Sequence, residues 1–442
     1  MEYQNETGQE QKSNSKWAKY ALALKVLSIG FIILLLLIPK AMISGLIDER
    51  SGRQQEAMRE VGQKWGSAQR LTGPFLLIPY KYSVETNDGF KTVTRLAYFL
   101  PENLKIDGKL QPDIRKRGIY KIPVYIYDGT VTGHFEKPDF SEWEIPESDI
   151  LYNQAKIVMG ITDLSGINEE VFIKWNGKDI KLQPGVPTNT VTKSGIHTLL
   201  PAADTTGDFA IHLSLNGSSM VSFAPVGEST EATLESSWNS PSFTGRFIPD
   251  KREITKDGFT AFWKILSLNR NYPQRWTSNS TYSPDRELFS VQLFQSVDHY
   301  KLNTRTVKYA IIIILLVFTT FFFFEILKKQ NIHVFQYILV GLAISIFYLL
   351  LLSFSEHLGF NRSYLIASIA VIGLILLYTS AILSEKKLVW LLGLALSGVF
   401  GFIFIILQME DYALLAGSLG LFLVLATVML ISRKVNWYQL KV

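Results

Sequence analysis

The chain has 442 residues, no cysteine and a formal net charge of +5. Without cysteine it has no thiol nucleophile, disulfide or thiolate metal ligand, and a chain of this length can bury a core without disulfides. The hydrophobic fraction of 48% averages two regimes, because residues 45–305 have the composition of a soluble domain and the rest do not.

Six apolar runs have the length of a membrane-spanning helix, about 20 residues. One run lies near the N-terminus, and the other five follow one another closely in the last third of the chain. Only helices and closed barrels satisfy every backbone group in lipid, so the runs are predicted to be helices. They cover residues 26–47, 309–327, 335–354, 364–384, 388–407 and 412–431.

Lysine and arginine gather on one side of these runs, which the positive-inside rule assigns to the cytoplasm. The pattern predicts six transmembrane helices, with both termini in the cytoplasm and residues 45–305 outside. That segment carries 30 Lys and Arg against 31 Asp and Glu, whereas the rest of the chain carries 14 against 8. The basic excess therefore belongs to the membrane flanks and does not indicate nucleic-acid binding.

Four segments follow in chain order. Residues 1–16 are polar and predicted to be a disordered extension. Residues 17–66 are predicted to form the first transmembrane helix, kinked near Pro39 and continuing into a periplasmic helix. Residues 67–305 form a periplasmic β-rich domain, and residues 306–442 a five-helix bundle with a short cytoplasmic tail.

The first run also has features of a cleavable signal peptide, with a passable cleavage context at residues 43–45. The helical pattern continues beyond that point, with Met58, Val61 and Trp65 among its sparse apolar positions. This continuation favours a retained anchor over a cleaved signal peptide.

The periplasmic segment alternates short β-strand patterns with turn residues, which is typical of a sandwich or of two small β-subdomains. The clearest predicted hairpin joins residues 209–215 to 220–225, because Asn216-Gly217 opens the connection. Further strands are predicted at residues 75–80, 92–100, 121–127 and 131–135.

A weak internal repeat leaves two interpretations open. The segment 104–108, LKIDG, is similar to 213–217, LSLNG, and Pro138-Asp-Phe140 is similar to Pro241-Ser-Phe243. Either the domain is duplicated, or the pattern is common to strands that enter turns.

Several long motifs carry a family resemblance. They are LLLLIPKAMISGLIDER, LTGPFLLIPY, FLPENLKIDGKLQPDIRKRGIYKIPVY, WNSPSFTGRFIP, the stretch from RTVKYA to SYLIAS, and NWYQL. These motifs resemble the CreD family of bacterial inner-membrane proteins, and the resemblance covers nearly the whole chain from about residue 30. It implies a cytoplasmic-membrane protein with a large periplasmic domain, linked to envelope integrity and stress tolerance, whose gene is controlled by a two-component regulator. The family offers no agreed biochemical activity and no established catalytic residues.

The sequence carries no phosphate loop, dinucleotide fingerprint, nucleophile elbow or zinc-protease motif, and no two histidines lie three or four residues apart. We therefore expect no cofactor or metal. The first hypothesis is a non-enzymatic envelope-integrity factor that contacts the lipid bilayer and envelope proteins or peptidoglycan. The alternative is a transporter or lipid-handling protein with a cavity in the bundle, and a membrane enzyme is a third class.

Two polar groups are candidate functional sites. Glu356, His357, Glu410 and Asp411 lie at the outer ends of two predicted helices, where they would bind a cation or relay protons. The simpler interpretation is that they are solvated helix ends.

Glu325 is the second candidate, because it is an acid within an aromatic run. It precedes Lys328 and Lys329 by three and four residues, which is the favourable order for a helix ion pair. The alternative is a carboxylate that lines a cavity.

Small residues recur at four-residue spacing on the last two predicted helices, which lets membrane helices approach closely. We expect these two helices to pack together. The small residues are Gly393, Ser397 and Gly401 on one helix, and Ala413 and Gly417, with Ala416 and Gly420, on the other.

Overall fold

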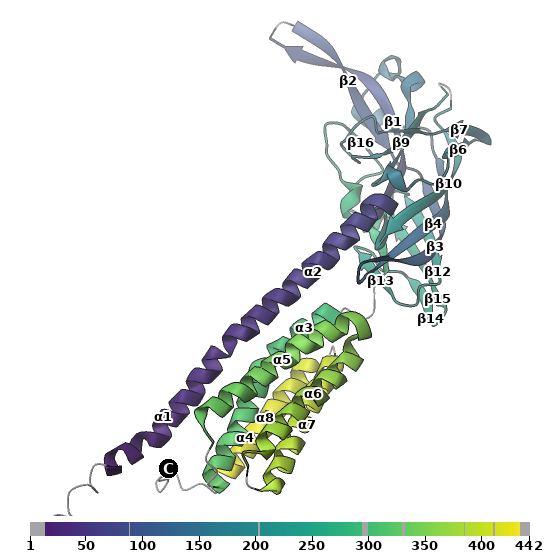
Figure 1. Cartoon of the computed structure of the whole chain (residues 1–442). Coiled ribbons are helices and arrows are strands. Elements are labelled where there is room, and N and C mark those ends of the chain that lie inside the picture. The colour runs from purple at the N-terminus through teal and green to yellow at the C-terminus, as the bar shows by residue number, and fades with distance from the viewer. Residues whose placement is uncertain are drawn as a thin grey trace, which may run out of the picture. The chain divides into compact units, whose positions relative to one another are not determined.

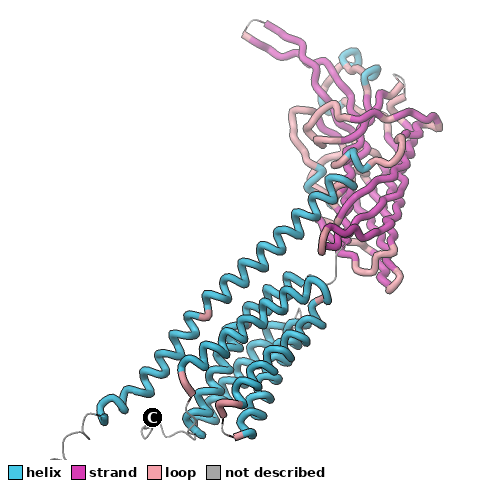
Figure 2. The backbone as a smooth tube through the Cα atoms, viewed as in Figure 1, coloured by secondary structure: helices cyan, strands magenta, loops and turns pink. Residues whose placement is uncertain are grey.

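A computed structural model describes residues 14–87, 89–201, 204–293, 299–328, 332–383, 385–409 and 412–433. Most of the predicted disordered extension therefore lies outside the described residues. The chain divides into two compact units (Figures 1 and 2). The helical unit comprises Met1–Arg53 and Val297–Val442, and the sandwich unit comprises Gln54–Ser296.

The first apolar run extends over α1 and the start of α2, and each of the other five overlaps one helix of the helical unit. By length and composition, four helices of the described chain suffice to cross a membrane, or five if α3 and α4, bent by 41° at Tyr309, form one span. The apolar part of α8 is shorter, so the count of six spans stays a prediction. The helices are α1 (Asn14–Leu35), α2 (Leu37–Trp65), α3 (His299–Lys308), α4 (Ala310–Lys328), α5 (Val334–Leu358), α6 (Phe360–Ser380), α7 (Lys386–Gln408) and α8 (Ala413–Ser432).

The N-terminal helix is interrupted at Leu36, between α1 and α2. Pro39 follows within one turn and has no backbone N–H to give to the carbonyl four residues earlier, which accounts for the irregularity. The helix then continues without a break to Trp65, as the sequence predicted.

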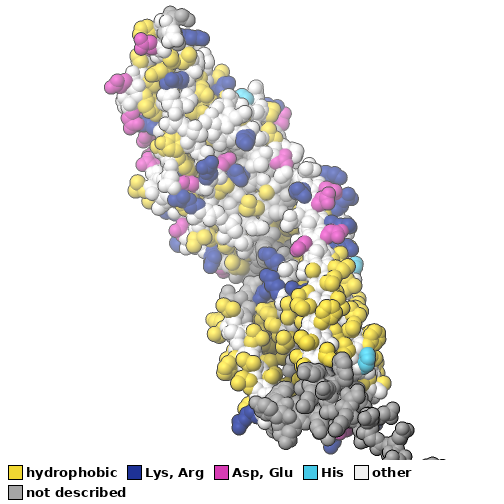
Figure 3. Space-filling model, turned by 90° about the vertical axis from the view of Figure 1, so that its left-hand side faces the viewer, with side chains coloured by type: hydrophobic (Ala, Val, Ile, Leu, Met, Phe, Trp, Pro, Cys, Tyr) yellow, Lys and Arg dark blue, Asp and Glu magenta, His cyan; other side chains and the backbone are white. Residues whose placement is uncertain are grey.

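Helix α5 is the centre of the helical unit, since it contacts α1, α3, α4 and α6. Its buried face carries Tyr337, Ile344, Phe347 and Leu351, all fully buried. On the face that Figure 3 shows, hydrophobic side chains cover the helices. This distribution is expected of helices surrounded by hydrocarbon.

Two β-sheets with a shared hydrophobic core form the sandwich unit. The first sheet has the order β13 (Pro241–Gly245), β17 (Phe289–Leu293), β11 (Met220–Phe223), β1 (Gln69–Thr86), β5 (Lys156–Ile161), β9 (Gly195–Leu199), β8 (Gln183–Pro184), with β2 (Gly89–Phe99) on β1 and β16 (Arg275–Thr277) on β2. The second has the order β14 (Lys251–Thr255), β15 (Gly258–Leu266), β12 (Ser229–Ser236), β3 (Asn103–Arg117), β4 (Tyr120–Phe135), β10 (Gly207–Ser218), β6 (Phe172–Trp175), β7 (Lys178–Lys181).

The hairpin predicted around Asn216-Gly217 is wrong. Strand β10 pairs with β4 and β6 in the second sheet, whereas β11 pairs with β1 and β17 in the first. The chain changes sheets at Ser219, whose φ is 63°. Gly217 lies inside β10, where a Cβ atom would come within 2.3 Å of the Tyr125 ring. The glycine therefore makes room for an aromatic ring and does not form a turn.

The two repeat segments have different strand orders. In residues 75–140, β1 and β2 belong to the first sheet and β3 and β4 to the second. In residues 185–245, the consecutive strands β9 to β13 alternate between the first sheet and the second. Pro138-Asp-Phe140 follows β4 outside any strand, while Pro241-Ser-Phe243 lies in β13. This topology gives no support to a duplication.

The last turns of α2 pack on the outer side of β4. Ala57 is buried there with Ile122 and Val124, and Met58, Val61 and Trp65 pack around them. Glu60 pairs with Arg117 at 3.0 Å, and the Arg115 guanidinium lies 4.3 Å from the centre of the Trp65 ring. The sparse apolar positions noted in the sequence are thus the contacts that fasten this helix to the sheet.

Candidate functional site

A buried ion pair links the N-terminal helix to α4. The ammonium of Lys25 contacts the carboxylate of Glu325, and their side chains are 17% and 8% exposed. The same ammonium donates to the carbonyl of Ile332, 2.8 Å away and just before α5. We call these three residues the Lys25 cluster. Because Lys25 satisfies two acceptors from different segments, it holds α1 against the α4–α5 connection.

Glu325 therefore has a partner that the sequence did not predict. Lys25 is 300 residues away in the chain, whereas the expected partners were three and four residues away. The side chain of Lys328 and all of Lys329 lie outside the described residues. A pair between Glu325 and either lysine accordingly stays a prediction.

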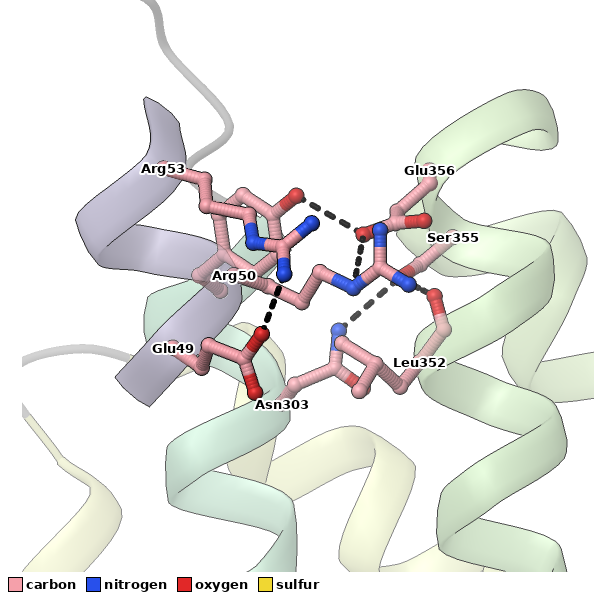
Figure 4. Close-up of polar contacts among 8 residues, drawn as sticks. Glu49, Arg50, Arg53, Asn303, Leu352, Ser355 and Glu356 are labelled. Carbon is pink, nitrogen blue, oxygen red and sulfur yellow. Dashed lines mark hydrogen bonds and ion pairs between the residues drawn. The ribbon is translucent and has the colours of Figure 1, made fainter. Parts of the chain in front are cut away.

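A second polar cluster joins α2, α3 and α5 (Figure 4). The hydroxyl of Tyr300 donates to the carboxylate of Glu356 at 2.9 Å, and the Nε of Arg50 lies 4.0 Å from the same oxygen. Beside them, the buried amide of Asn303 donates to Ser355 at 2.9 Å. We call these five residues the Arg50 cluster. They place three helices around one carboxylate.

The Arg50 cluster contains only part of the predicted outer site. Glu356 belongs to it, with a side chain only 9% exposed, so this acid is not a solvated helix end. His357 is exposed on the last turn of α5. Glu410 and Asp411 lie outside the described residues. Among the described residues no group of three metal-ligating side chains occurs. Cation binding by the four predicted residues therefore stays a prediction.

The two clusters hold the N-terminal helix at two levels. Lys25 and Arg50 are 25 residues apart, or about 37 Å along a helix, compared with about 30 Å for a hydrocarbon core. Glu325 lies in the last turn of α4 and Glu356 in the last turn of α5, at opposite ends of this antiparallel pair. Charged groups so spaced suit the two interfaces of a bilayer.

The predicted small-residue contacts have other neighbours. A Cβ atom at Gly393 would meet Leu376 of α6, while at Gly401 or Gly417 it would meet nothing within 4 Å. The close approach of α7 and α8 occurs at Gly420, one of the small residues at this spacing on α8, against the ring of Phe402. The side chain of Ala413 is outside the described residues. Helices α7 and α8 contact each other, through Gly420 and not through Gly401 or Gly417.

Helices α4, α7 and α8 enclose a groove of about 680 Å³. Its walls are residues 309–324, 388–406 and 417–428, almost all apolar. The transporter alternative called for a polar-lined cavity, and this lining does not provide one.

The sequence profile described as "Inner membrane protein CreD" matches residues 21–438. A curated relative from Escherichia coli (strain K12), named "Inner membrane protein CreD", is 36% identical over 432 residues, covering 95% of this chain and 94% of the relative. The chain belongs to the CreD family. With its apolar helices, it is a multi-pass inner-membrane protein.

The CreD match includes every residue of both polar clusters, from Lys25 to Glu356. Sequence reasoning found the two acids but missed Lys25, Arg50, Tyr300 and Asn303. One signal was present, because Lys25 directly precedes the first apolar run and matches a lone acid at the same predicted membrane face. The others lie in polar segments, where no periodicity distinguishes them.

Proposed function

We propose that this protein supports the integrity of the cell envelope and its tolerance of stress, non-enzymatically, through the sandwich unit in the periplasm. Both termini would lie in the cytoplasm. The distribution of lysine and arginine supports this orientation. Membership of the CreD family of inner-membrane proteins supports a role at the cell envelope.

The observation that carries the proposal is a projecting ribbon, formed by residues 81–94 of β1 and β2 (Figure 1). In the described chain these residues pair only with each other, from Lys81 with Thr94 to Thr86 with Gly89. Nearer the core, β1 also pairs with β5, and β2 with β16. Within the described chain the ribbon therefore leaves the sheet as two strands, and residues 81–86 and 90–94 pair with no third strand.

Such a ribbon suits contact with another envelope component. Two-stranded hairpins are only marginally stable alone, and open edges accept an added strand. Near the tip, Phe90 is 82% exposed, and at the base Tyr82 stacks under Arg95 at 3.7 Å. Aromatic and arginine side chains are the types enriched at protein interfaces. We infer that the ribbon contacts envelope proteins or peptidoglycan.

A photoreactive amino acid in place of Phe90 tests this role in growing cells. The matched control is the same replacement at Leu268, which is 92% exposed elsewhere on the sandwich unit. We expect a discrete crosslinked product from position 90 only, together with increased dye uptake for Phe90→Ser but not Leu268→Ser. Equal crosslinking and equal dye uptake at positions 90 and 268 would show that the ribbon is not the contact surface.

The orientation has its own test, because the chain has no cysteine. Cells that carry Phe90→Cys or Lys387→Cys are converted to spheroplasts and treated with a membrane-impermeant maleimide. We expect labelling of position 90 in intact spheroplasts, and of position 387 only after lysis. The reverse pattern would place the sandwich unit in the cytoplasm.

A further inference from the structure

We propose that the groove between α4, α7 and α8 binds a hydrocarbon chain of an anionic phospholipid. This inference concerns the helical unit alone and does not depend on the role of the ribbon. It rests on the groove's shape and lining and on the charges at one end.

The groove is open at its side, since Leu391 and Leu394 of α7 line it and are 52% and 72% exposed. Its wall on α4, residues 309–324, is about 22 Å long at 1.5 Å per residue. Its volume of about 680 Å³ falls within the range of ligand pockets.

The lining offers little to a polar ligand. Thr320 donates its hydroxyl hydrogen to the carbonyl of Leu316 at 2.9 Å, and Thr427 donates to Leu423 at 2.8 Å. Two of the four hydroxyls in the lining are thus used within their own helices, and the other two belong to Tyr309 and Thr319. An apolar chain loses no hydrogen bond on entering such a groove, whereas a polar substrate would lose its hydration with little compensation.

Two glycines give the groove its depth. Gly398 of α7 and Gly417 of α8 both line it, and a Cβ atom on either would meet no heavy atom within 4 Å. Leu388, at one end of the groove, is ten residues from Gly398, or about 15 Å along α7. That distance is half of a ~30 Å hydrocarbon core, so a chain entering at Leu388 ends near Gly398.

Basic residues surround that end. Lys386 and Lys387 begin α7, directly before Leu388, and both are exposed. Arg433, just after α8, is exposed on the same side by chain direction. The acids on that side of the described chain are Glu385 and Glu325, and Glu325 is paired with Lys25. The excess of positive charge selects an anionic headgroup over a zwitterionic one.

The test uses the full chain in nanodiscs of zwitterionic and anionic phospholipid, with a trace of anionic phospholipid carrying a diazirine at its chain end. We expect labelling to concentrate on the groove residues near Gly398. Gly398→Leu fills the space where the chain ends and lowers this labelling about tenfold or more, as excluding a few methylenes does in apolar pockets. Lys386→Gln with Lys387→Gln removes the preference for the anionic probe.

The matched control is Gly401→Leu, because Gly401 lies three residues along the same helix, has open space for a Cβ and does not line the groove. It should label as the wild type does, and a thermal unfolding midpoint confirms that each variant is folded. Labelling spread evenly onto the exposed face of α6, at Ile369 for example, or unchanged in Gly398→Leu, overturns the proposal.

Discussion

Removal of the Lys25 ammonium is the most informative perturbation of the helical unit. Lys25→Met keeps an unbranched side chain in α1 but deletes the partner of Glu325 and the donor to the carbonyl of Ile332. The second carboxylate oxygen of Glu325 is already buried without a partner among the described residues. The variant therefore leaves a whole carboxylate without its cation.

The expected cost follows from the burial of both partners. With side chains only 17% and 8% exposed, solvent screens the pair little. Removing one member of such a pair typically lowers the free energy of unfolding by about 3–5 kcal/mol, because the remaining charge stays buried and uncompensated. Replacing both members by apolar residues is often neutral or stabilising. We therefore expect Lys25→Met to be strongly destabilising, and Lys25→Met with Glu325→Leu to recover wild-type stability.

A denaturant titration of the full chain in mixed micelles, followed by tryptophan fluorescence, measures these differences. Lys40→Met is the control, since it makes the same replacement in α2, just beyond the interruption, without breaking an ion pair in the described chain. A loss below about 1 kcal/mol for Lys25→Met, or no recovery in the double variant, would refute a buried pair at this site. The experiment also tests whether the first transmembrane helix is retained or cleaved as a signal peptide, because a cleaved chain would lack Lys25.

Three further outcomes are expected. Tyr300→Phe deletes the hydroxyl that donates to the carboxylate of the Arg50 cluster and should lower the free energy of unfolding by about 1.5–3 kcal/mol in the same titration. The backbone N–H of Ser141 holds the pKa of Asp139 at about 2, below its ordinary 3.8. The resulting stability is present above pH 3.8 and lost as pH falls towards 2, so Asp139→Asn should flatten the acid limb of a pH-unfolding curve. Gly217→Ala places a methyl group against the Tyr125 ring and should cost about 1–3 kcal/mol, measured by thermal unfolding of the sandwich unit.

The helices could be located from the sequence because the helical signal is local. Backbone hydrogen bonds in a helix join residues four apart, and the length needed to cross hydrocarbon is a property of one contiguous run. The predicted run 309–327 corresponds to Ala310–Lys328, and the run 335–354 lies within Val334–Leu358. The break at Leu36 was likewise expected from the nearby proline.

Strand positions were predictable, but strand partners were not. The predicted strand 209–215 lies within β10, where the alternating Ile211, Leu213 and Leu215 form the buried face. The same stretch suggested a hairpin at Asn216-Gly217. In the structure, position 217 is a glycine because the Tyr125 ring on β4 leaves no room for a Cβ atom. Sheet pairing is non-local, so the residue that explains a glycine is often far away in the chain.

For the polar sites, too, the sequence located unusual residues but not their partners. Composition and charge placement by themselves determined a membrane protein with a soluble insert, because hydropathy and net charge are sums over neighbouring residues. Glu325 was recognised as unusual for the same reason. Only the tertiary structure decided that its partner is Lys25, 300 residues away, and that Glu356 is covered by Tyr300 and Arg50. The partner of a buried charge is set by which residues pack beside it in the folded chain and not by their separation in the sequence.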